Sequence, residues 1–169
     1  SAQHAHSPGP APAGPDTSTA QRAASADPDA AVPTSGDSPD APIILIVDDD
    51  PINVEVLANY VRGAYRTIET CSSLEAIRWI REGLRPDLVL LDIMMPHANG
   101  FDICRHIRDR YGSGEMPVLF LSARNPIADL TTAFEMGAND YIVKPVDKQE
   151  LLARIAMHLR LAQWNRSLE

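Results

Sequence analysis

Five short strand-like runs, four of them apolar, recur between residues 43 and 143, each separated from the next by a segment of helix length. The runs cover 43–47, 66–70, 87–91, 117–121 and 140–143. Runs of this kind, rich in Val, Ile and Leu, are typical of strands buried on both faces of a parallel sheet. Helices are expected at 52–62, 73–83, 99–110, 127–136 and 147–160. The alternation predicts a doubly wound α/β fold, with a five-stranded parallel sheet and right-handed crossovers.

Local signals support several helix boundaries. Pro51 suits the first position of a helix, where its missing N–H would be unpaired in any case. Ser72 and Ser73 are candidate N-caps, because their hydroxyls can accept a bond from the first turn. Gly137 directly follows Met136, where a helix end often needs a left-handed residue.

Polar residues follow four of the five runs at the point where each strand is expected to end. They are Asp48, Asp49 and Asp50 after the first run, Asp92 after the third, Ser122 after the fourth and Lys144 after the fifth. In an open parallel sheet, ligands bind outside the carboxyl ends of the strands. The pattern therefore predicts one site at one edge of the sheet, with carboxylates, a hydroxyl and an ammonium.

These groups indicate metal-assisted phosphate chemistry. Neighbouring carboxylates repel one another, and a cation among them relieves that repulsion. Oxygen ligands alone favour Mg²⁺ or Mn²⁺, and Mg²⁺ commonly shares its ligands with phosphate oxygens. Asp92, on the expected central strand, is placed to attack phosphorus and form an acyl phosphate. Ser122 and Lys144 would then hold the phosphoryl oxygens.

The same residues carry a family resemblance. Asp48-Asp49, Asp92, Ser122 and Lys144-Pro145, with the segment 137–141, resemble the receiver domain of two-component response regulators. The resemblance runs from about Ile43 to Leu161. It implies the flavodoxin-like fold with strand order 2-1-3-4-5, and it implies a signalling switch rather than an enzyme with a separate substrate.

The resemblance also implies metal and phosphoryl roles. Asp92 would take the phosphoryl group from a histidine kinase or a histidine phosphotransfer protein. Asp49 would bind Mg²⁺ directly, together with Asp92 and the main-chain carbonyl of Met94. Asp48 would act through a metal-bound water, and Asp50 is interpreted as a surface or helix-start acid.

Further roles follow from matching positions in the family. Ser122, Lys144 and the backbone N–H of Ala123 would bind the phosphoryl oxygens. Tyr141 would be the aromatic switch that turns inward when Ser122 moves towards the phosphate. The output surface would be formed by the fourth helix, the fifth strand and the fifth helix.

Three residues near the site receive narrower predictions. Met94 and Arg124 stand two residues after Asp92 and Ser122, where the family tunes phosphoryl lifetime. A bulky Met and a cation there predict a phosphoaspartate of intermediate to long life. His97 is expected to be an exposed loop residue rather than a phosphate relay.

Residues 1–42 differ in composition from the rest. They hold eight of the fourteen prolines and no large apolar residue beyond Val32, which predicts a disordered, Ala/Pro/Ser-rich tether. His4 and His6 are too few ligands to predict a metal site.

Charge, hydropathy and cysteine content limit the classes of partner and the compartment that are expected. The net charge of −8 without a Lys or Arg cluster argues against direct nucleic-acid binding. No apolar stretch approaches the roughly 20 residues of a membrane span. We expect a cytoplasmic protein, or the cytoplasmic part of a larger membrane-bound one. Cys71 and Cys104 are expected to be free, buried thiols in a reducing compartment.

The last helix carries two apolar stripes. Leu152, Ile155 and Leu159 should pack on the sheet. The second stripe consists of Met157, Leu161, Trp164 and Leu168. It fits either a tail, 162–169, that folds back on the domain, or a helix that runs on to a partner helix or an output domain. A homodimer through this helix, a hybrid histidine kinase and a separate regulator all remain open.

Alternative functions are also open. One is a receiver-like scaffold that is never phosphorylated. Another is a phosphohydrolase with an aspartyl intermediate of the haloacid dehalogenase kind, which would need a second acid where Met94 stands. A flavodoxin-like binding module would need a phosphate-cradling loop in place of Asp48, Asp49 and Asp50.

Overall fold

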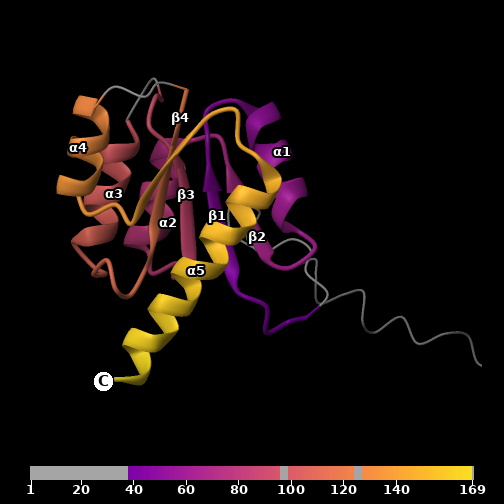
Figure 1. Ribbon diagram of the computed structural model, residues 1–169. Helices are drawn as coiled ribbons and strands as arrows, with labels where there is room; N and C mark the ends of the chain where they lie inside the picture. The colour runs from indigo at the N-terminus through magenta and orange to yellow at the C-terminus, as the bar shows by residue number, and fades with distance from the viewer. Residues whose placement is uncertain (1–37, 96–98, 124–126, 169) are drawn as a thin grey trace, which may run out of the picture. The chain divides into compact units, whose positions relative to one another are not determined.

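The computed structural model describes residues 38–95, 99–123 and 127–168. Five parallel strands form one sheet in the order β2-β1-β3-β4-β5 (Figure 1). Their bounds are β1 Ile43–Val47, β2 Arg66–Thr70, β3 Leu88–Asp92, β4 Val118–Ser122 and β5 Asp140–Val143. The flavodoxin-like fold and strand order expected from the sequence are confirmed.

Five helices alternate with the strands. They are α1 Pro51–Val61, α2 Ser73–Arg81, α3 Gly100–Arg108, α4 Ile127–Glu135 and α5 Lys148–Ser167. The second helix ends earlier than predicted, since Gly83 takes a φ of 108°, which a helix cannot accommodate. The fifth runs past the predicted end at residue 160. The expected boundary between 161 and 162 therefore falls inside one continuous helix.

The predicted helix starts have the expected local causes. The Asp50 carboxylate accepts a bond from the backbone N–H of Ile52 and caps α1, with Pro51 at its first position. Asp50 is thus the helix-start acid that was predicted. Ser72, rather than Ser73, caps α2, and Gly137 follows α4 with a φ of 93°.

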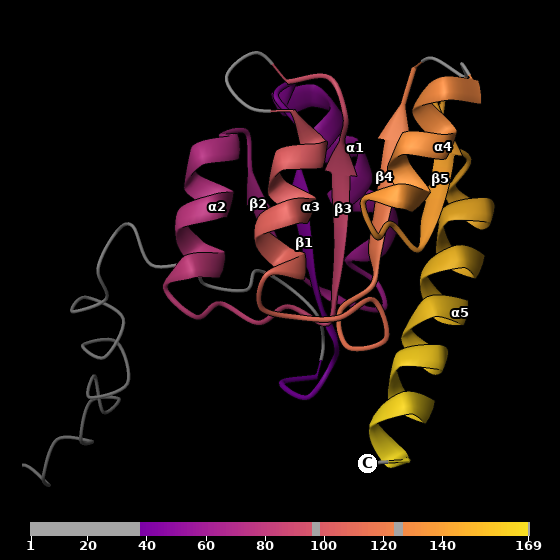
Figure 2. The ribbon, with the colours of Figure 1, turned by 90° about the vertical axis from the view of Figure 1, so that its left-hand side faces the viewer.

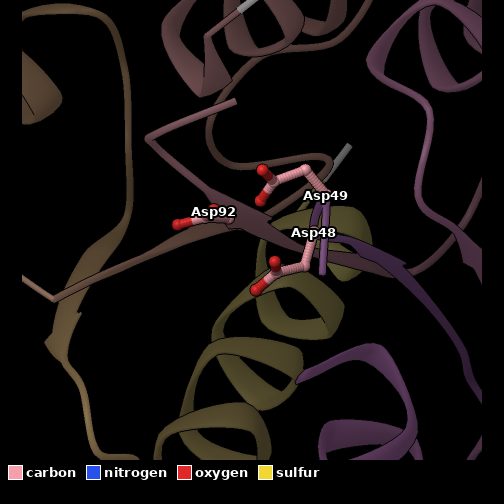
Figure 3. A group of neighbouring side chains, drawn as sticks. All are labelled: Asp48, Asp49 and Asp92. Carbon is pink, nitrogen blue, oxygen red and sulfur yellow. The ribbon is translucent and has the colours of Figure 1, made fainter. Parts of the chain in front are cut away.

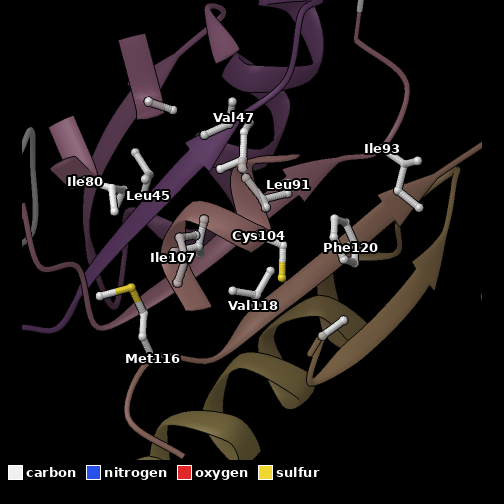
Figure 4. Packing of buried hydrophobic residues seen from close by; sticks show 14 of the residues in the cluster. Leu45, Val47, Ile80, Leu91, Ile93, Cys104, Ile107, Met116, Val118 and Phe120 are labelled. Atoms are coloured by element: carbon white, nitrogen blue, oxygen red, sulfur yellow. The ribbon is translucent and has the colours of Figure 1, made fainter. Parts of the chain in front are cut away.

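Each face of the sheet carries its own hydrophobic core. Helices α2, α3 and α4 cover one face, seen towards the viewer in Figure 2, and α1 and α5 cover the other. Alternate residues of a strand point to opposite faces. Leu45 and Val47 therefore join the first core, shown in Figure 4, whereas Ile44 and Ile46 join the second.

The two cysteines are free but differ in burial. Cys104 is fully buried in the first core, as predicted. Cys71 is exposed, and its predicted burial is wrong. It is the first residue after β2, beyond the last pair of the β1–β2 register at Thr70.

Some predictions concern residues that the structure does not describe. The proposed tether lies outside the described residues over 1–37, as do His97 and Arg124. Among the helices of the described part, none combines the length and the apolar character that a membrane span requires.

Candidate functional site at the carboxyl edge of the sheet

Two neighbouring strands bring the key acids together. Asp92 is the last residue of β3, and Asp48 directly follows β1. Val47 pairs with Leu91 in the β1–β3 register, so the next residue on each strand is an aspartate. The predicted meeting of these carboxylates thus follows directly from the register of two parallel strands.

The three carboxylates of Asp48, Asp49 and Asp92 form one cluster. One oxygen of each lies within 4.8 Å of an oxygen of the other two, and Figure 3 shows the side chains converging. Asp48 and Asp92 are buried, with 1% and 5% of their surface exposed, whereas Asp49 is exposed. The cluster therefore has a buried floor and one acid on the solvent side.

Lys144 brings a cation into the cluster. It follows β5, and its Nζ lies 2.8 Å from Oδ2 of Asp48 and 3.4 Å from Oδ1 of Asp92. The other oxygen of Asp48, Oδ1, accepts a hydrogen bond of 3.0 Å from the backbone N–H of Asp50. Asp48 is thus held at both oxygens, while the ammonium contacts Asp92 at longer range.

These surroundings change how the acids and the lysine titrate. Burial, reinforced by the charge of Asp48, raises the pKa of Asp92 to about 6, although Lys144 opposes the rise. Burial alone would lower the pKa of Lys144, but its bonds to Asp48 and Asp92 outweigh burial and raise it. Lys144 therefore stays an ammonium at neutral pH, and Asp92 gives up its proton less readily than an ordinary aspartate.

The donor set fits a small divalent cation. One ammonium among three carboxylates leaves an excess of negative charge at a partly buried site. Carboxylate oxygens without nitrogen or sulfur ligands favour Mg²⁺ or Mn²⁺. Met94, which was predicted to offer its main-chain carbonyl, lies two residues beyond Asp92, with its side chain 56% exposed.

The predicted phosphate-binding residues lie on the same edge. Ser122 ends β4 and is buried, and the following residue, Ala123, is exposed. The backbone N–H of Lys144 donates a 2.7 Å bond to the carbonyl of Ser122. This bond joins the ends of β4 and β5, so the hydroxyl and the ammonium come from adjacent strand ends.

Tyr141 lies in the sheet beside this edge. It pairs with Phe120 in the β4–β5 register and is 8% exposed, within the core that α4 covers. The ring therefore occupies an inward position in this structure. That the Tyr141 ring responds when Ser122 moves towards a phosphoryl group remains a prediction.

Two features of the site were not predicted. A groove of about 430 Å³ adjoins Lys144 and Ala123, and its lining is Asn53, Val56, Leu57, Tyr60, Ala123, Lys144, Pro145 and Val146. Partly exposed Val56 was an available signal for it, because an apolar residue on the outer side of α1 has no core to join.

The second unpredicted feature is Gly100, the first residue of α3. A Cβ there would lie 2.5 Å from the backbone oxygen of Asp92 and 2.9 Å from the Phe120 ring. Only a glycine lets α3 start this close to the end of β3. Nothing in the sequence pattern marks this contact, since it depends on how the β3–α3 loop folds.

Comparison with known proteins agrees with the geometry. The family model of the response regulator receiver domain matches residues 44–156. The DNA-binding response regulator MtrA of Mycolicibacterium smegmatis is 42% identical over 118 residues, which cover 69% of this chain and 50% of that protein. The transcriptional regulatory protein AfsQ1 of Streptomyces coelicolor is 39% identical over 118 residues, covering 70% of this chain and 51% of that protein.

A solved structure extends the likeness to three dimensions. The crystal structure of a putative response regulator from Chloroflexus aurantiacus superposes with a TM-score of 0.65 and 36% identity. The match covers 71% of this chain and 98% of that one. The chain spans about half the length of the curated relatives that it matches.

Proposed function

Because the chain belongs to the family of response regulator receiver domains, we propose that it is a phosphoacceptor switch in a two-component phosphorelay. Asp92 is the acceptor. The observation that carries this proposal is the position of Asp92, which ends the central strand between an acid pair, Asp48 and Asp49, and the Lys144 ammonium. Each neighbour has a task in moving a phosphoryl group to a carboxylate.

The transfer would be a displacement at the phosphorus atom. A carboxylate oxygen of Asp92 forms a bond to phosphorus while the bond from phosphorus to the imidazole nitrogen of a phosphohistidine breaks. The electron pair of that bond leaves with the imidazole. Asp92 must be ionised to attack, and its pKa of about 6 leaves the carboxylate available at neutral pH.

A divalent cation supplies charge neutralisation for the phosphoryl oxygens when it is bound. Asp49, Asp92 and the carbonyl of Met94 would hold Mg²⁺ or Mn²⁺ directly, and Asp48 through water. Asp48 suits the indirect role because both of its oxygens already accept hydrogen bonds, from Lys144 and from the N–H of Asp50.

Three further groups would bind the phosphoryl oxygens. Lys144 can turn its ammonium from Asp48 towards the incoming group, since it already lies 3.4 Å from Asp92. The Ser122 hydroxyl and the backbone N–H of Ala123 come from the adjacent strand end. Donors held in place before the reaction stabilise charge that develops on the phosphoryl oxygens.

The phosphodonor approaches over α1. The groove of about 430 Å³ opens beside Lys144 and Ala123 and is walled by Val56 and Tyr60 of α1. A protein that presents a phosphohistidine on a helix can lay apolar side chains in this groove while its imidazole reaches Asp92. The donor would be a histidine kinase or a histidine phosphotransfer protein.

The switch would couple Ser122 to Tyr141, which lie on the paired strands β4 and β5. A Ser122 hydroxyl drawn to the phosphoryl group vacates space beside β4, and the Tyr141 ring, already inward, is held there. The surface of α4, β5 and α5 would change in consequence. Met94, which is exposed, and Arg124 would slow hydrolysis and give a phosphoaspartate of intermediate to long life.

In the whole protein, the switch would control an output domain, and the receiver itself would not bind nucleic acid or membrane. The net charge of −8 supports this division. The phosphorelay would run in the cytoplasm. That compartment keeps exposed thiols such as Cys71 reduced.

The deciding experiment is intact mass after incubation with acetyl phosphate, with and without Mg²⁺. One added phosphoryl group is expected in the wild-type chain with metal, and none in Asp92→Asn. Asp109→Asn, which removes an exposed aspartate of the α3 end, serves as the matched control and should be phosphorylated normally. Failure of the wild type with acetyl phosphate and with several histidine kinases would support the scaffold alternative instead.

A further inference from the structure

The groove beside Lys144 contains a half-buried amide, that of Asn53. Four residues of α1 line the groove, and their spacing places them on one side of the helix: Asn53, Val56, Leu57 and Tyr60. Within the described part of the chain, no group forms a hydrogen bond with the side-chain amide of Asn53. The amide is therefore available to a molecule that enters the groove.

The fold gives no structural reason for an asparagine at this position. Asn is a weak helix former, because its side chain competes for backbone hydrogen bonds. Asn59, on the exposed side of the same helix, has a partner, since its Oδ1 accepts a 3.0 Å bond from Nη1 of Arg62. Asn53 has no such bond and faces the groove. A role in binding explains it better than a role in folding.

Asn53 stands in the first turn of α1, at the end of the helix that adjoins the acidic cluster. Asp50, which caps that helix, donates through its backbone N–H to Oδ1 of Asp48 at 3.0 Å. The groove also includes Lys144, whose Nζ lies 3.4 Å from the acceptor carboxylate. Tyr60, the other polar residue of α1 in the lining, is roughly 10 Å further along the helix axis. The neutral amide closest along α1 to the acceptor is thus that of Asn53.

The chemistry of the transfer places the leaving group near this amide. In-line displacement puts the leaving group on the far side of phosphorus from the attacking oxygen. With the phosphoryl group held by Asp92 and Lys144, the imidazole of a phosphohistidine would point outwards, to the groove that Lys144 adjoins. One ring nitrogen is not bonded to phosphorus. That nitrogen needs a hydrogen-bond partner once the groove excludes water.

We propose that Asn53 accepts a hydrogen bond from the imidazole that leaves the phosphodonor. The assignment rests on the proposed function of Asp92 and adds a donor preference to it. Oδ1 of Asn53 accepts from the N–H of the ring nitrogen that is not bonded to phosphorus. As an oxygen of Asp92 bonds to phosphorus, the P–N bond breaks and its electron pair stays on the ring nitrogen. The other nitrogen keeps its proton, so the ring leaves as neutral imidazole.

This hydrogen bond makes the site selective for phosphodonors that carry an imidazole ring. A site built to hydrogen-bond a substrate N–H disfavours analogues that lack it, because its own polar group is then left unpaired. Phosphoimidazole has the P–N bond and the ring but no protein surface. Phosphoramidate has a P–N bond without the ring, and acetyl phosphate has neither. These three small phosphodonors separate the contribution of the ring from that of the bond and of protein docking.

The rates at which the three donors phosphorylate the full chain in Mg²⁺, followed by intact mass, test the assignment. In Asn53→Leu, the ratio of the phosphoimidazole rate to the acetyl phosphate rate should fall roughly five- to tenfold. The ratio of phosphoramidate to acetyl phosphate should stay constant, and each ratio cancels any general effect on Asp92. Asn59→Leu, on the exposed side of the same helix, is the matched control and should keep both ratios. Unchanged ratios in Asn53→Leu would overturn the assignment.

Two more measurements separate binding of the ring from a role in folding. Asn53→Asp keeps an acceptor oxygen and should retain the preference for phosphoimidazole, although its charge slows all three reactions. A lost preference in Asn53→Asp would contradict the acceptor role. Asn53→Leu should melt no lower than the wild type, because it breaks no hydrogen bond within the described domain. A large loss of stability would instead show that Asn53 is structural.

The same experiment distinguishes this assignment from the proposed function. If no donor phosphorylates the wild type, or if phosphorylation persists in Asp92→Asn, both the proposed function and the role of Asn53 are wrong. If Asp92 is phosphorylated normally and the ratios do not respond to Asn53→Leu, only the role of Asn53 is wrong.

Discussion

The Lys144 ammonium lies closer to Asp48, at 2.8 Å, than to Asp92, at 3.4 Å. The lysine is thus paired first with the buried acid that is not the proposed acceptor. This pairing holds the ends of β1 and β5 together. The longer contact to Asp92 is the one that a phosphoryl group would replace. The same side chain therefore contributes to the stability of the metal-free domain and to the proposed transfer.

Lys144→Met should destabilise the metal-free protein. Two buried carboxylates would lose their cation, at a cost of about 3 kcal/mol in unfolding free energy. Mg²⁺ should restore more stability to this variant than to the wild type, because it replaces the missing charge. Urea unfolding in EDTA and in Mg²⁺ measures both effects. Lys148→Met, at the exposed start of α5, is the control, and an equal loss in both variants would contradict the expectation.

The raised pKa of Asp92 predicts a pH dependence. Its folded value of about 6 lies above the ordinary 3.8. The contribution of a group with a raised folded pKa is fully present below its unfolded pKa and is lost as pH rises through the folded value. Relative to Asp92→Asn, the metal-free wild type should lose on the order of 2 kcal/mol of stability between about pH 4 and pH 7.

Urea unfolding at several pH values in EDTA measures this difference. Parallel stability curves for the wild type and Asp92→Asn would show that Asp92 ionises normally. Mg²⁺ binding gives a second measurement, because the cation competes with the proton on Asp92. The affinity for Mg²⁺, measured by calorimetry, should weaken as pH falls through 6.

Asp140 should act in a different pH range. Burial alone would raise the pKa of Asp140, but hydrogen bonds from His158 and Arg154 outweigh it and lower the pKa below 3.8. A carboxylate with a lowered folded pKa stabilises the fold above its unfolded pKa and ceases to do so as pH falls through the folded value. Its contribution is therefore lost only in acid, below the range in which Asp92 titrates.

His158→Leu tests this contact. The imidazole Nε2 lies 3.0 Å from Oδ2 of Asp140, and both side chains are largely buried. Removing the imidazole should cost about 1–2 kcal/mol at neutral pH, because a buried carboxylate oxygen loses its partner. The loss should shrink in acid as Asp140 protonates. Thermal unfolding against His106→Leu, at a half-buried histidine of α3, gives the comparison; similar losses in both variants would argue against the contact.

Gly100→Ala should disturb both the fold and the acceptor. The new Cβ would meet the backbone oxygen of Asp92 at 2.5 Å, which no side-chain rotation relieves. We expect a loss of about 1–3 kcal/mol and slower phosphorylation by acetyl phosphate. Gly63→Ala is the matched control, since a Cβ there meets nothing within 4 Å. Unchanged melting temperature and rate in Gly100→Ala would show that the β3–α3 junction yields easily.

Arg108 joins α3 to the turn before β5. Its guanidinium donates to the carbonyls of Gly137 and Met116, at 2.9 Å and 2.8 Å, and to Oδ1 of Asn139 at 2.8 Å. Arg108→Met should remove these hydrogen bonds, although Oδ1 of Asn139 keeps its bond from the backbone N–H of Val118, and it should cost about 2–4 kcal/mol by urea unfolding. Arg105→Met, which removes an exposed pair with Asp102, should cost little. Equal costs would contradict this role.

The fold and the composition of the acidic cluster could both be predicted from the sequence. Strands and helices are local in origin, and parallel strands joined by right-handed crossovers bring their carboxyl ends to one edge. Once the strands were identified, the residues at their carboxyl ends were expected to lie close together. These residues are Asp48, Asp92, Ser122 and Lys144. The helix cap at Asp50 was equally predictable, because capping involves only neighbouring residues.

Features that depend on distances between segments far apart in the chain could be seen only in the folded protein. The preference of Lys144 for Asp48, the close approach of Gly100 to Asp92 and the exposure of Cys71 each depend on how loops leave the sheet. Hydrophobic periodicity correctly predicted that Leu152, Ile155 and Leu159 would pack on the sheet, but it left open whether the stripe that begins at Met157 would be covered. Packing decided that, because α5 can turn only one side to the sheet, and the stripe that begins at Met157 stayed in solvent.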